Sequence, residues 1–412
     1  MKRAILISAL HSKNENVERN LLELEELARS IGISSVAKFW QFVERPLNTY
    51  IGKGKLEKVA TYIDLYEADG VIADDELSVV QKTKLEEFLK VEVLDRTEVI
   101  LRNFSRSART SEGKAEVELA TLEYRLSHLK GSNSGLSRTG GGIGTRGPGE
   151  SKLETDRRAI RERIRNLKKK LQRLSKNRDV KKRKRIDSLL PKISIAGYTN
   201  AGKSLLLKRL SGFETKSEDK LFTTLDPTTK KVWLGDNVFA LVSDTVGFIS
   251  KLPTQLVNAF RSTLEEVVDS DLILLMIDGS EEDSAKKLEI SKGILDDIGA
   301  EKIPYLLVVN KIDLCDRSYL EKLAREYPQA IFISAKMELY LEDLMERMKD
   351  LVTAKYVERN LEFSNERWFK ISKMVGVRIL KVEHVDNRVR AKLKIHPSIL
   401  KKVMEENDVL SP

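Results

Sequence analysis

The chain has 412 residues, which is long enough for two to four domains with hydrophobic cores of their own. No apolar run approaches the roughly 18 residues of a membrane span, so we expect no membrane-spanning helix. A single cysteine, Cys315, excludes an internal disulfide framework and favours a reducing cytoplasm. The net charge is +10, and residues 150–190 hold 17 lysines and arginines against six acidic residues. The basic character is therefore assigned to that one segment.

Residues 1 to about 106 alternate short apolar runs with amphipathic helical patterns, beginning with AILISAL and LLELEELARSIG and ending with VVQKTKLEEFLK and VEVLD. Short strands separated by helices predict a wound, parallel α/β sheet. The N-terminal MKRAILISAL imitates a signal peptide, but polar residues follow it at once without a small-residue cleavage site. We therefore expect a first β-strand there.

Two leucine-rich helical patterns follow the predicted sheet. Leucines at 119, 122, 126 and 129 are spaced three and four apart, and so are the apolar residues at 160, 164, 167, 171 and 174. Such seams are typical of helices that pack on one another, so the sequence predicts an antiparallel helical hairpin. The second helix continues into KNRDVKKRKRID, where seven of twelve residues are basic. This excess favours an acidic partner, most simply nucleic acid, over a solvated helix face.

Between the two helices, residues 131–150 hold eight of the chain's 22 glycines together with Arg138 and Arg146. A disordered linker is one interpretation. A loop that approaches phosphates needs both flexible backbone and arginines, which a spacer does not. We favour a binding loop at the tip of the hairpin.

The apolar run KISIA leads into GYTNAGKS at 197–204, followed by LLLKRL. A strand, a G-x-x-x-x-G-K-S loop and a helix in this order are the context of a phosphate-binding loop. Gly197 and Gly202 let backbone N–H groups surround a β-phosphate, and Lys203 reaches the β and γ oxygens. The hydroxyl of Ser204 would bind Mg²⁺.

Forty-seven residues after Gly197, the run FALVS ends at Asp244, and Gly247 follows. A carboxylate at this strand end can hold the Mg²⁺ shell, and the Gly247 N–H can sense a γ-phosphate. The intervening LFTTLDPTTK offers hydroxyls for the metal; we favour Thr224, with Thr223 as the alternative. Phe248 stands where many such enzymes keep a polar side chain to orient water, so water activation must come from elsewhere.

The run LLVV leads into NKID at 310–313. Asp313 can accept hydrogen bonds from N1 and N2 of guanine, Asn310 would support the base edge, and Lys311 would lie along its face. Adenine would leave the carboxylate unpaired, which rejects a ligand by roughly 10⁴ or more. Ser334, Ala335 and Lys336 follow another strand, where a backbone N–H can reach the guanine O6. The sequence therefore predicts a GTP-binding domain.

The chain resembles the HflX family of ribosome-associated GTPases, in the Obg–HflX branch of translation-factor-type GTPases. The resemblance covers the chain from the N-terminal sheet through residue 336, and its carriers are VIADDELSVVQ with LDRT, FSRSARTSEGKAEVELA, GGGIGTRGPGESKLE, FTTLDPTT and DTVGFI. It implies binding to the large ribosomal subunit and its RNA, in ribosome rescue, dissociation or biogenesis. It also implies that a hydrophobic residue at Phe248 is normal. Asn200 resembles the asparagine that related GTPases use to hold K⁺.

We expect GTP as substrate, GDP as product, Mg²⁺ as cofactor and a K⁺ ion beside Asn200. The expected catalytic residues are Lys203, Asn200 and Gly247, and the expected metal ligands are Ser204 and Thr224. The expected nucleotide-binding residues are Gly197, Tyr198, Thr199, Asn200, Ala201, Gly202, Lys203, Ser204, Phe222, Thr223, Thr224, Leu225, Asp226, Asp244, Thr245, Val246, Gly247, Asn310, Lys311, Ile312, Asp313, Ser334, Ala335 and Lys336.

The predicted organisation has four parts: an N-terminal α/β domain (1–106), the basic hairpin (107–185), a P-loop GTPase domain (186–352) and a small α+β tail domain (353–412). The tail reads as a helix-flanked hairpin, VRILKVEHV and RVRAKLKI around a turn at Asp386 and Asn387. We expect a cytoplasmic monomer when the protein is off the ribosome. Two rivals remain: a nucleotide-regulated RNA remodeller whose N-terminal domain uses ATP, and an RNA-binding scaffold with slow or no turnover.

Overall fold

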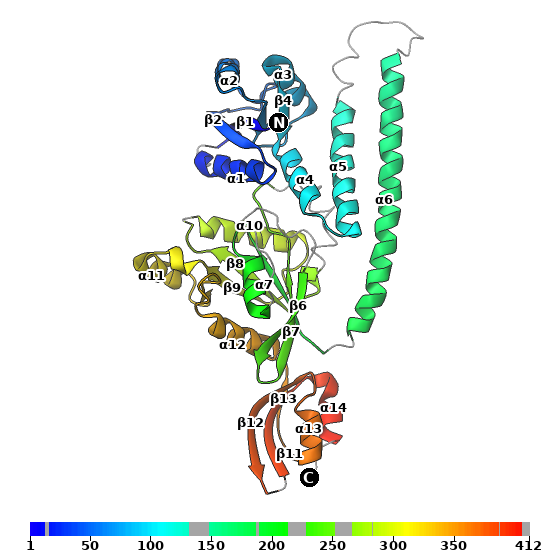
Figure 1. The fold of residues 1–412 in the computed structure, drawn as a ribbon, viewed down its shortest axis with the longest axis vertical. Coiled ribbons are helices and arrows are strands. Elements are labelled where there is room, and N and C mark those ends of the chain that lie inside the picture. Colours follow the sequence, from blue (N-terminus) through cyan, green and yellow to red (C-terminus); the bar gives the residue numbers. More distant parts are fainter. Residues whose placement is uncertain are drawn as a thin grey trace. The chain divides into compact units, whose positions relative to one another are not determined.

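A computed structural model describes residues 1–12, 16–131, 148–186, 189–212, 228–251, 266–281, 283–386 and 388–405. The chain divides into two compact units (Figure 1). The first is built mainly from Met1–Lys176, and the second from Asn177–Asp219, Asp226–Ser250 and Ser262–Pro412.

The first unit begins with a parallel four-stranded sheet in the order β2-β1-β3-β4, as predicted. Its strands are β1 (Arg3–Leu10), β2 (Ser34–Phe42), β3 (Gly70–Ala73) and β4 (Glu92–Asp95). The helices between and after them are α1 (Val17–Ser30), α2 (Lys53–Tyr66), α3 (Val79–Leu89) and α4 (Arg96–Ser107). Because helices cover both faces (Figure 1), β1 is buried along seven of its eight residues.

Local capping fixes where these helices begin. The Ser78 hydroxyl accepts from the Gln81 N–H while the Gln81 side chain accepts from the Ser78 N–H, and Asp95 and Glu98 form the same reciprocal pair. Such capping boxes satisfy N–H groups that the first helical turn cannot pair internally. The start of α4 therefore lies directly at the carboxyl end of β4.

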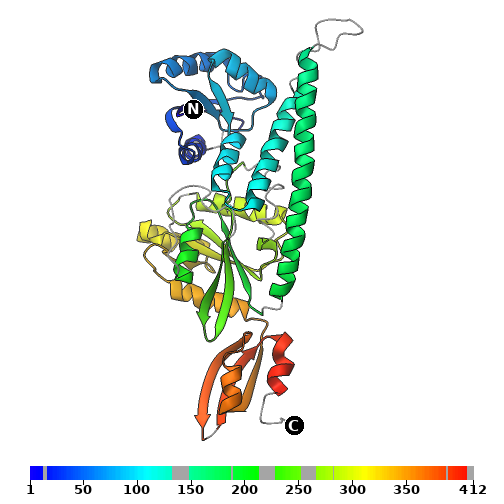
Figure 2. The ribbon, with the colours of Figure 1, turned by 45° about the vertical axis from the view of Figure 1, so that its right-hand side comes forward.

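The helical hairpin consists of α5 (Ser111–Gly131) and α6 (Pro148–Ile186), which lie side by side in both views (Figures 1 and 2). Ala115 and Leu119 pack on Ile164 and Leu167, with the other described seam residues around them. Two ion pairs, Arg163–Glu118 at 2.7 Å and Lys168–Glu123 at 2.8 Å, flank the seam. The predicted helix-packing seams are confirmed, whereas the predicted tip loop falls largely on residues 132–147, outside the described residues.

The second unit contains a six-stranded sheet in the order β10-β9-β8-β5-β7-β6. All neighbours are parallel except β6 and β7, which form an antiparallel hairpin. The strands are β5 (Lys192–Gly197), β6 (Thr228–Gly235), β7 (Val238–Asp244), β8 (Leu272–Asp278), β9 (Tyr305–Asn310) and β10 (Ile331–Phe332). The helices are α7 (Lys203–Ser211), α10 (Ser284–Asp297), η1 (Ile312–Leu314), α11 (Arg317–Glu326) and α12 (Leu341–Val352).

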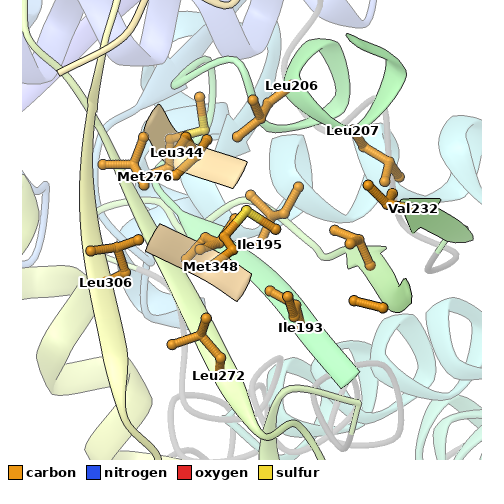
Figure 3. Packing of buried hydrophobic residues seen from close by; sticks show 14 of the residues in the cluster. Ile193, Ile195, Leu206, Leu207, Val232, Leu272, Met276, Leu306, Leu344 and Met348 are labelled. Atoms are coloured by element: carbon orange, nitrogen blue, oxygen red, sulfur yellow. The ribbon is translucent and has the colours of Figure 1, made fainter. Parts of the chain in front are cut away.

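One face of this sheet carries a large hydrophobic core cluster of the second unit (Figure 3). Ile193 and Ile195 of β5 pack beside Met276 of β8, and Leu344 and Met348 of α12 close over them. All five side chains are at most 1% exposed. Burying a side chain of this size stabilises a fold by about 1.5–3 kcal/mol, so this cluster fixes the strand ends that carry the site.

A three-stranded antiparallel sheet, in the order β11-β13-β12, follows the six-stranded sheet in the chain. It contains β11 (Val357–Ser364), β12 (Val377–Val385) and β13 (Arg388–Ile395), with α13 (Asn365–Ile371), η2 (Pro397–Ile399) and α14 (Leu400–Glu405). The predicted hairpin of β12 and β13 is confirmed; Asn387 of its turn lies outside the described residues. Strand β11 was not predicted, because its VERNLEFS has only two fully inward apolar residues, Leu361 and Phe363.

The turn between β6 and β7 contacts this C-terminal sheet within the second unit. Arg378 of β12 pairs with Asp236 at 3.3 Å and with Asp350 of α12 at 2.6 Å. The Asn237 amide donates to the carbonyls of Met374 and Val377 at 3.2 and 3.1 Å. A buried arginine with several carboxylates therefore holds the sheet to the β6–β7 turn.

Candidate active site

The phosphate-binding loop joins β5 to α7, as the sequence predicts. Gly202 caps α7 with φ 94°, and a Cβ there would lie 2.4 Å from Nδ2 of Asn310. Only glycine fits both the left-handed backbone and the close approach. Asn200 also has a positive φ of 63°, which asparagine tolerates better than most residues. The loop thus leads directly into the N-terminus of α7, where backbone N–H groups stabilise an anion.

Lys203 lies at the first position of α7 and is 7% exposed. Its ammonium donates to the Tyr198 carbonyl at 2.7 Å. Burial lowers the pKa of Lys203 to about 8, although the negative charge of Asp244 opposes the shift. A phosphate beside this nitrogen would restore the charged form, so the lysine is placed to bind one.

Ser204 and Asp244 meet at the carboxyl ends of neighbouring strands. β5 pairs with β7 so that Ile195 is opposite Asp244, and the Ser204 hydroxyl donates to Oδ2 of Asp244 at 2.6 Å. A hydroxyl and a carboxylate fit Mg²⁺, which prefers oxygen ligands and completes its shell with water and substrate phosphates. Within the described ranges no three His, Cys, Asp or Glu side chains gather as a metal site.

Gly247 approaches the phosphate-binding loop closely. A Cβ at this position would lie 2.7 Å from Cγ2 of Thr199 and 3.0 Å from Nζ of Lys203. The next residue, Phe248, is 2% exposed and pairs with the loop through its backbone. Its N–H donates to the Gly197 carbonyl at 3.0 Å, and its carbonyl accepts from the Thr199 N–H at 2.7 Å. Phe248 therefore acts as a packing residue, with no group to activate water.

Asn310 links two loops beneath the expected base pocket. Its Nδ2 donates to the Ala201 carbonyl at 2.8 Å, and its Oδ1 accepts from the Ala335 N–H at 2.9 Å. Asp313 accepts from the Ser334 hydroxyl at 2.6 Å. The structure therefore brings together NKID, the SAK segment and the phosphate-binding loop, which are far apart in the sequence.

The side chains of the remaining predicted residues take no part in the contacts described above or lie outside the described residues. Thr245 is fully buried, and its hydroxyl donates to the Ile195 carbonyl at 2.8 Å, which directs the side chain to β5. The Tyr198 hydroxyl accepts from the Ser250 N–H at 2.5 Å. Val246 is buried, Ile312 is half-buried in η1 and Lys336 is exposed. Five expected residues, Phe222, Thr223, Thr224, Leu225 and Asp226, lie outside the described residues.

Three family models match successive parts of the chain. Residues 18–105 match a model described as GTP-binding GTPase N-terminal, and residues 107–185 match the GTP-binding GTPase middle region. Residues 192–311 match a model described as 50S ribosome-binding GTPase.

Curated relatives decide the family. The chain is 45% identical over 350 residues to the GTPase HflX of Caldanaerobacter subterraneus, covering 84% of this chain and 80% of that one. The chain belongs to the HflX family of GTPases. Against the HflX of Lacrimispora saccharolytica it is 41% identical, over 94% of this chain and 92% of the relative. Against that of Escherichia coli it is 32% identical, over 97% and 94%.

Among solved structures, a GTP-binding protein from the archaeon Sulfolobus solfataricus in complex with GDP is 26% identical, with a TM-score of 0.44. The match covers 86% of this chain and 99% of that protein. Membership of the HflX family, together with the P-loop GTPase domain, shows that the chain binds and hydrolyses GTP.

The HflX site contains one side chain that sequence reasoning missed. Asp278, at the end of β8, pairs with Nζ of Lys311 at 2.6 Å and also accepts from the Ser280 N–H at 3.0 Å. It ends the apolar run LILLMI much as Asp244 ends FALVS. Asp278 could have been predicted from its position at the end of a buried strand. Its ion pair positions the lysine expected to lie along the base.

Proposed function

We propose that the protein is a Mg²⁺-dependent GTPase that binds the large ribosomal subunit and its RNA in the GTP state, and that it acts in ribosome rescue, dissociation or biogenesis. The match of residues 192–311 to the 50S ribosome-binding GTPases supports the partner. None of the helices in the described part of the chain combines the length and hydropathy of a membrane crossing. The proposal places a monomer in the cytoplasm when off the ribosome.

The helical hairpin carries the proposal. Between residues 154 and 174, one face of α6 packs on α5 while the cations Arg158, Arg161, Arg165, Lys169 and Lys170 are exposed. Because the apolar side of α6 packs on α5, the opposite, basic side can bind a polyanion while the helix stays folded. Lysines and arginines against phosphates release counterions, so the affinity should fall steeply with salt.

The rival with ATP in the N-terminal domain is less favoured. Ligands of parallel sheets bind at the carboxyl ends of strands, and that edge here contains Asp74, Asp75, Glu76 and Asp95. Asp74 already pairs with Arg96 at 2.7 Å, so the cation at this edge is used by a carboxylate and is not kept for a triphosphate. The scaffold rival is opposed by membership of a GTPase family.

For the nucleotide site, we propose that Ser204 and Thr224 hold Mg²⁺, that Asp244 holds its water shell, and that Lys203 and the Gly247 N–H bind the phosphates. The ion would offset negative charge on the phosphate oxygens. Asn200, exposed at the turn of the loop, is proposed to hold K⁺ near the same oxygens. Asp313 would accept from guanine, with Lys311 along its face.

Sedimentation with purified 50S subunits tests the partner. We expect co-sedimentation with a non-hydrolysable GTP analogue, little with GDP, and a fall in log K of roughly 0.7 to 0.9 per log unit of salt for each phosphate contacted. If the protein pellets with the subunits equally in both nucleotides, or in neither, the proposal is wrong.

A loop replacement tests the hairpin. Exchanging residues 138–149 for a short inert turn should abolish subunit binding and leave intrinsic GTP hydrolysis largely intact. Unchanged co-sedimentation would place the tip outside the interface.

Nucleotide affinities test the metal ligands. Ser204→Ala or Thr224→Ala should weaken Mg²⁺-dependent triphosphate binding more than diphosphate binding, because each hydroxyl would hold the ion that offsets phosphate charge, and a triphosphate carries more of that charge. Equal losses for the two nucleotides would show that neither hydroxyl is a ligand.

A further inference from the structure

The central strand of the C-terminal sheet has a strict two-residue alternation. Val389, Ala391, Leu393 and Ile395 are buried, whereas every intervening residue of β13 is a cation: Arg388, Arg390, Lys392 and Lys394. Side chains of a strand alternate between faces, so the four cations share one face of the sheet. Lys381 of β12, which pairs in register with Lys392, lies on the same face. We call these five residues the basic sheet face.

Helices cover the opposite face of the sheet. Leu361, Leu393 and Ile395 pack there with Ile371 of α13 and Val403 of α14. At one end of the basic sheet face, Arg378 pairs in register with Lys394 and is buried against Asp236 and Asp350. Away from that end the cations are exposed: the side chains of Arg388 and Arg390 are 55% and 61% exposed, and that of Lys381 is 69% exposed. Packing therefore explains the apolar half of β13 and leaves the row of cations unexplained.

Three carboxylates partly neutralise the basic sheet face. Glu362 of β11 pairs with Arg388 at 3.2 Å and Arg390 at 3.0 Å, and Glu358 pairs with Lys392 at 2.7 Å. Glu383 pairs with Lys381. Five cations thus face three carboxylates. Exposed ion pairs contribute only about 0–1 kcal/mol each, so a stronger anion can exchange for them at little cost.

The C-terminal tail as a whole also carries a net positive charge. Residues 353–412 contain 13 lysines and arginines against eight acidic residues, a net charge of +5. The sequence-based conclusion that one segment holds all the basic character is therefore incomplete. It failed because acidic residues elsewhere in the chain cancel this second excess in the total.

We propose that the basic sheet face binds the sugar-phosphate backbone of RNA. Cations on alternate residues of a strand recur about every 6.8 Å, a spacing close to that of successive phosphates along an extended nucleic-acid strand. A flat row suits such a repeating polyanion better than an acidic protein, whose carboxylates are not evenly spaced. Arginine guanidinium groups keep further N–H donors for phosphate while paired with Glu362. The choice of RNA among polyanions rests on the proposed ribosomal function.

Matched variants of the full chain test the proposal. The first carries Arg388→Gln, Arg390→Gln and Lys392→Gln on β13. The control carries Lys370→Gln, Lys401→Gln and Lys402→Gln, which remove the same charge from exposed positions of α13 and α14. Binding of a fluorescein-labelled 12-nucleotide RNA is followed by anisotropy across a KCl series. GTP turnover of each variant reports that the protein is folded.

We expect the first variant to lower the slope of log K against log salt by about 2, since each lost phosphate contact of a single strand is worth about 0.7. The control should change the slope by less than one. An unchanged slope in the first variant, or equal changes in both, would overturn the proposal. Loss of polyglutamate binding with RNA binding intact would instead assign the face to an acidic protein.

A gain-of-function variant keeps the test independent of folding losses. Glu358→Gln with Glu362→Gln frees three cations and should raise both the affinity for the RNA and the salt slope. No increase would contradict the proposal. Sedimentation of the wild type with 50S subunits is read separately, so failure of the ribosomal function is distinguishable from failure of this face to bind RNA.

Discussion

Two sheets in this chain place charged groups at the carboxyl ends of their parallel strands, but the charges are compensated differently. In the N-terminal sheet, Asp74 and Asp95 are fully buried and already satisfied: Asp74 pairs with Arg96 at 2.7 Å, and Asp95 accepts from the Tyr124 hydroxyl at 2.6 Å. In the GTPase sheet, the buried Lys203 donates to a neutral carbonyl.

The difference shows that topology alone does not make a binding site. Burial raises the pKa of Asp74, although Arg96 opposes the shift, and burial lowers the pKa of Lys203. The first edge balances its charge internally, whereas the second keeps a cation for a ligand. The N-terminal edge therefore stabilises its domain, and the GTPase edge is the one that we propose binds nucleotide.

The largest expected effect sharpens the specificity of the GTPase edge. Asp313→Asn replaces an acceptor for guanine with a group that also donates, so preference should move from GTP toward xanthosine triphosphate by roughly 10⁴. Turnover with each nucleotide measures the change. Normal half-saturation by GTP in the variant would show that Asp313 does not select the base.

A matched pair of substitutions could break the comparison. Arg96→Met removes the cation that the buried Asp74 shares with the half-buried Glu23. Lys251 still pairs with Asp74 at 2.7 Å, so the N-terminal unit should lose at most about 3–5 kcal/mol of unfolding free energy while GTP turnover stays within a few-fold. Lys203→Met should lower turnover by roughly 10² to 10³ without lowering stability, since it removes a buried charge. Urea denaturation and GTP turnover are measured on both variants, and the comparison fails if their effects exchange.

Proton uptake tests the charge state of Lys203. With a pKa of about 8, the free protein should take up about half a proton at pH 8 when GDP binds, and about a tenth at pH 7. Calorimetry in buffers of different ionisation enthalpy gives these numbers. Lys203→Arg, which stays charged, is the control and should lack this uptake.

The same shift affects stability with a definite sign. The unfolded lysine keeps its proton up to about pH 10.5, whereas the folded one loses it at about 8. Burying the charged lysine therefore lowers the free energy of unfolding below pH 8, and this loss disappears as the pH rises from 8 to 10.5. Wild type should gain stability relative to Lys203→Met across that window.

The smallest expected effect concerns Phe248. Because its role lies in packing and backbone pairing, Phe248→Leu should keep basal turnover within a few-fold, at a stability cost of less than about 1.5 kcal/mol. The attacking water must then be activated by a group other than this side chain. We expect 50S subunits to stimulate GTP turnover of the wild type by tens-fold or more, since a catalytic group supplied in trans can raise the rate by about 10³ to 10⁵. Loss of basal hydrolysis with nucleotide binding intact, or binding to subunits without stimulation, would contradict this account.

The phosphate-binding loop, the DTVG segment and NKID could be predicted because each is local: a strand, a turn and a few side chains lie within ten residues. Strand periodicity likewise predicted the N-terminal sheet, and leucine spacing predicted the packing of α5 on α6.

Contacts between distant segments could not be predicted in this way. Asn310 forms hydrogen bonds to both Ala201 and Ala335, and Asp278 pairs with Lys311. Each of these contacts depends on which strands become neighbours in the sheet. Strand β11 was missed because four of its eight residues are charged or amide side chains. Its place is set by pairing with β13 along its whole length.

The bridge between Tyr198 and Phe248 also has a consequence for amide exchange. The N–H groups of Thr199 and Phe248 both donate across it, and the phenyl ring is buried. Exposing these amides requires breaking both bonds and hydrating the ring, so opening the bridge should cost several kcal/mol. The two amides should exchange with solvent as slowly as those of β5 and β7. Residues 244–248 would then open together with the central strands, as one cooperative unit.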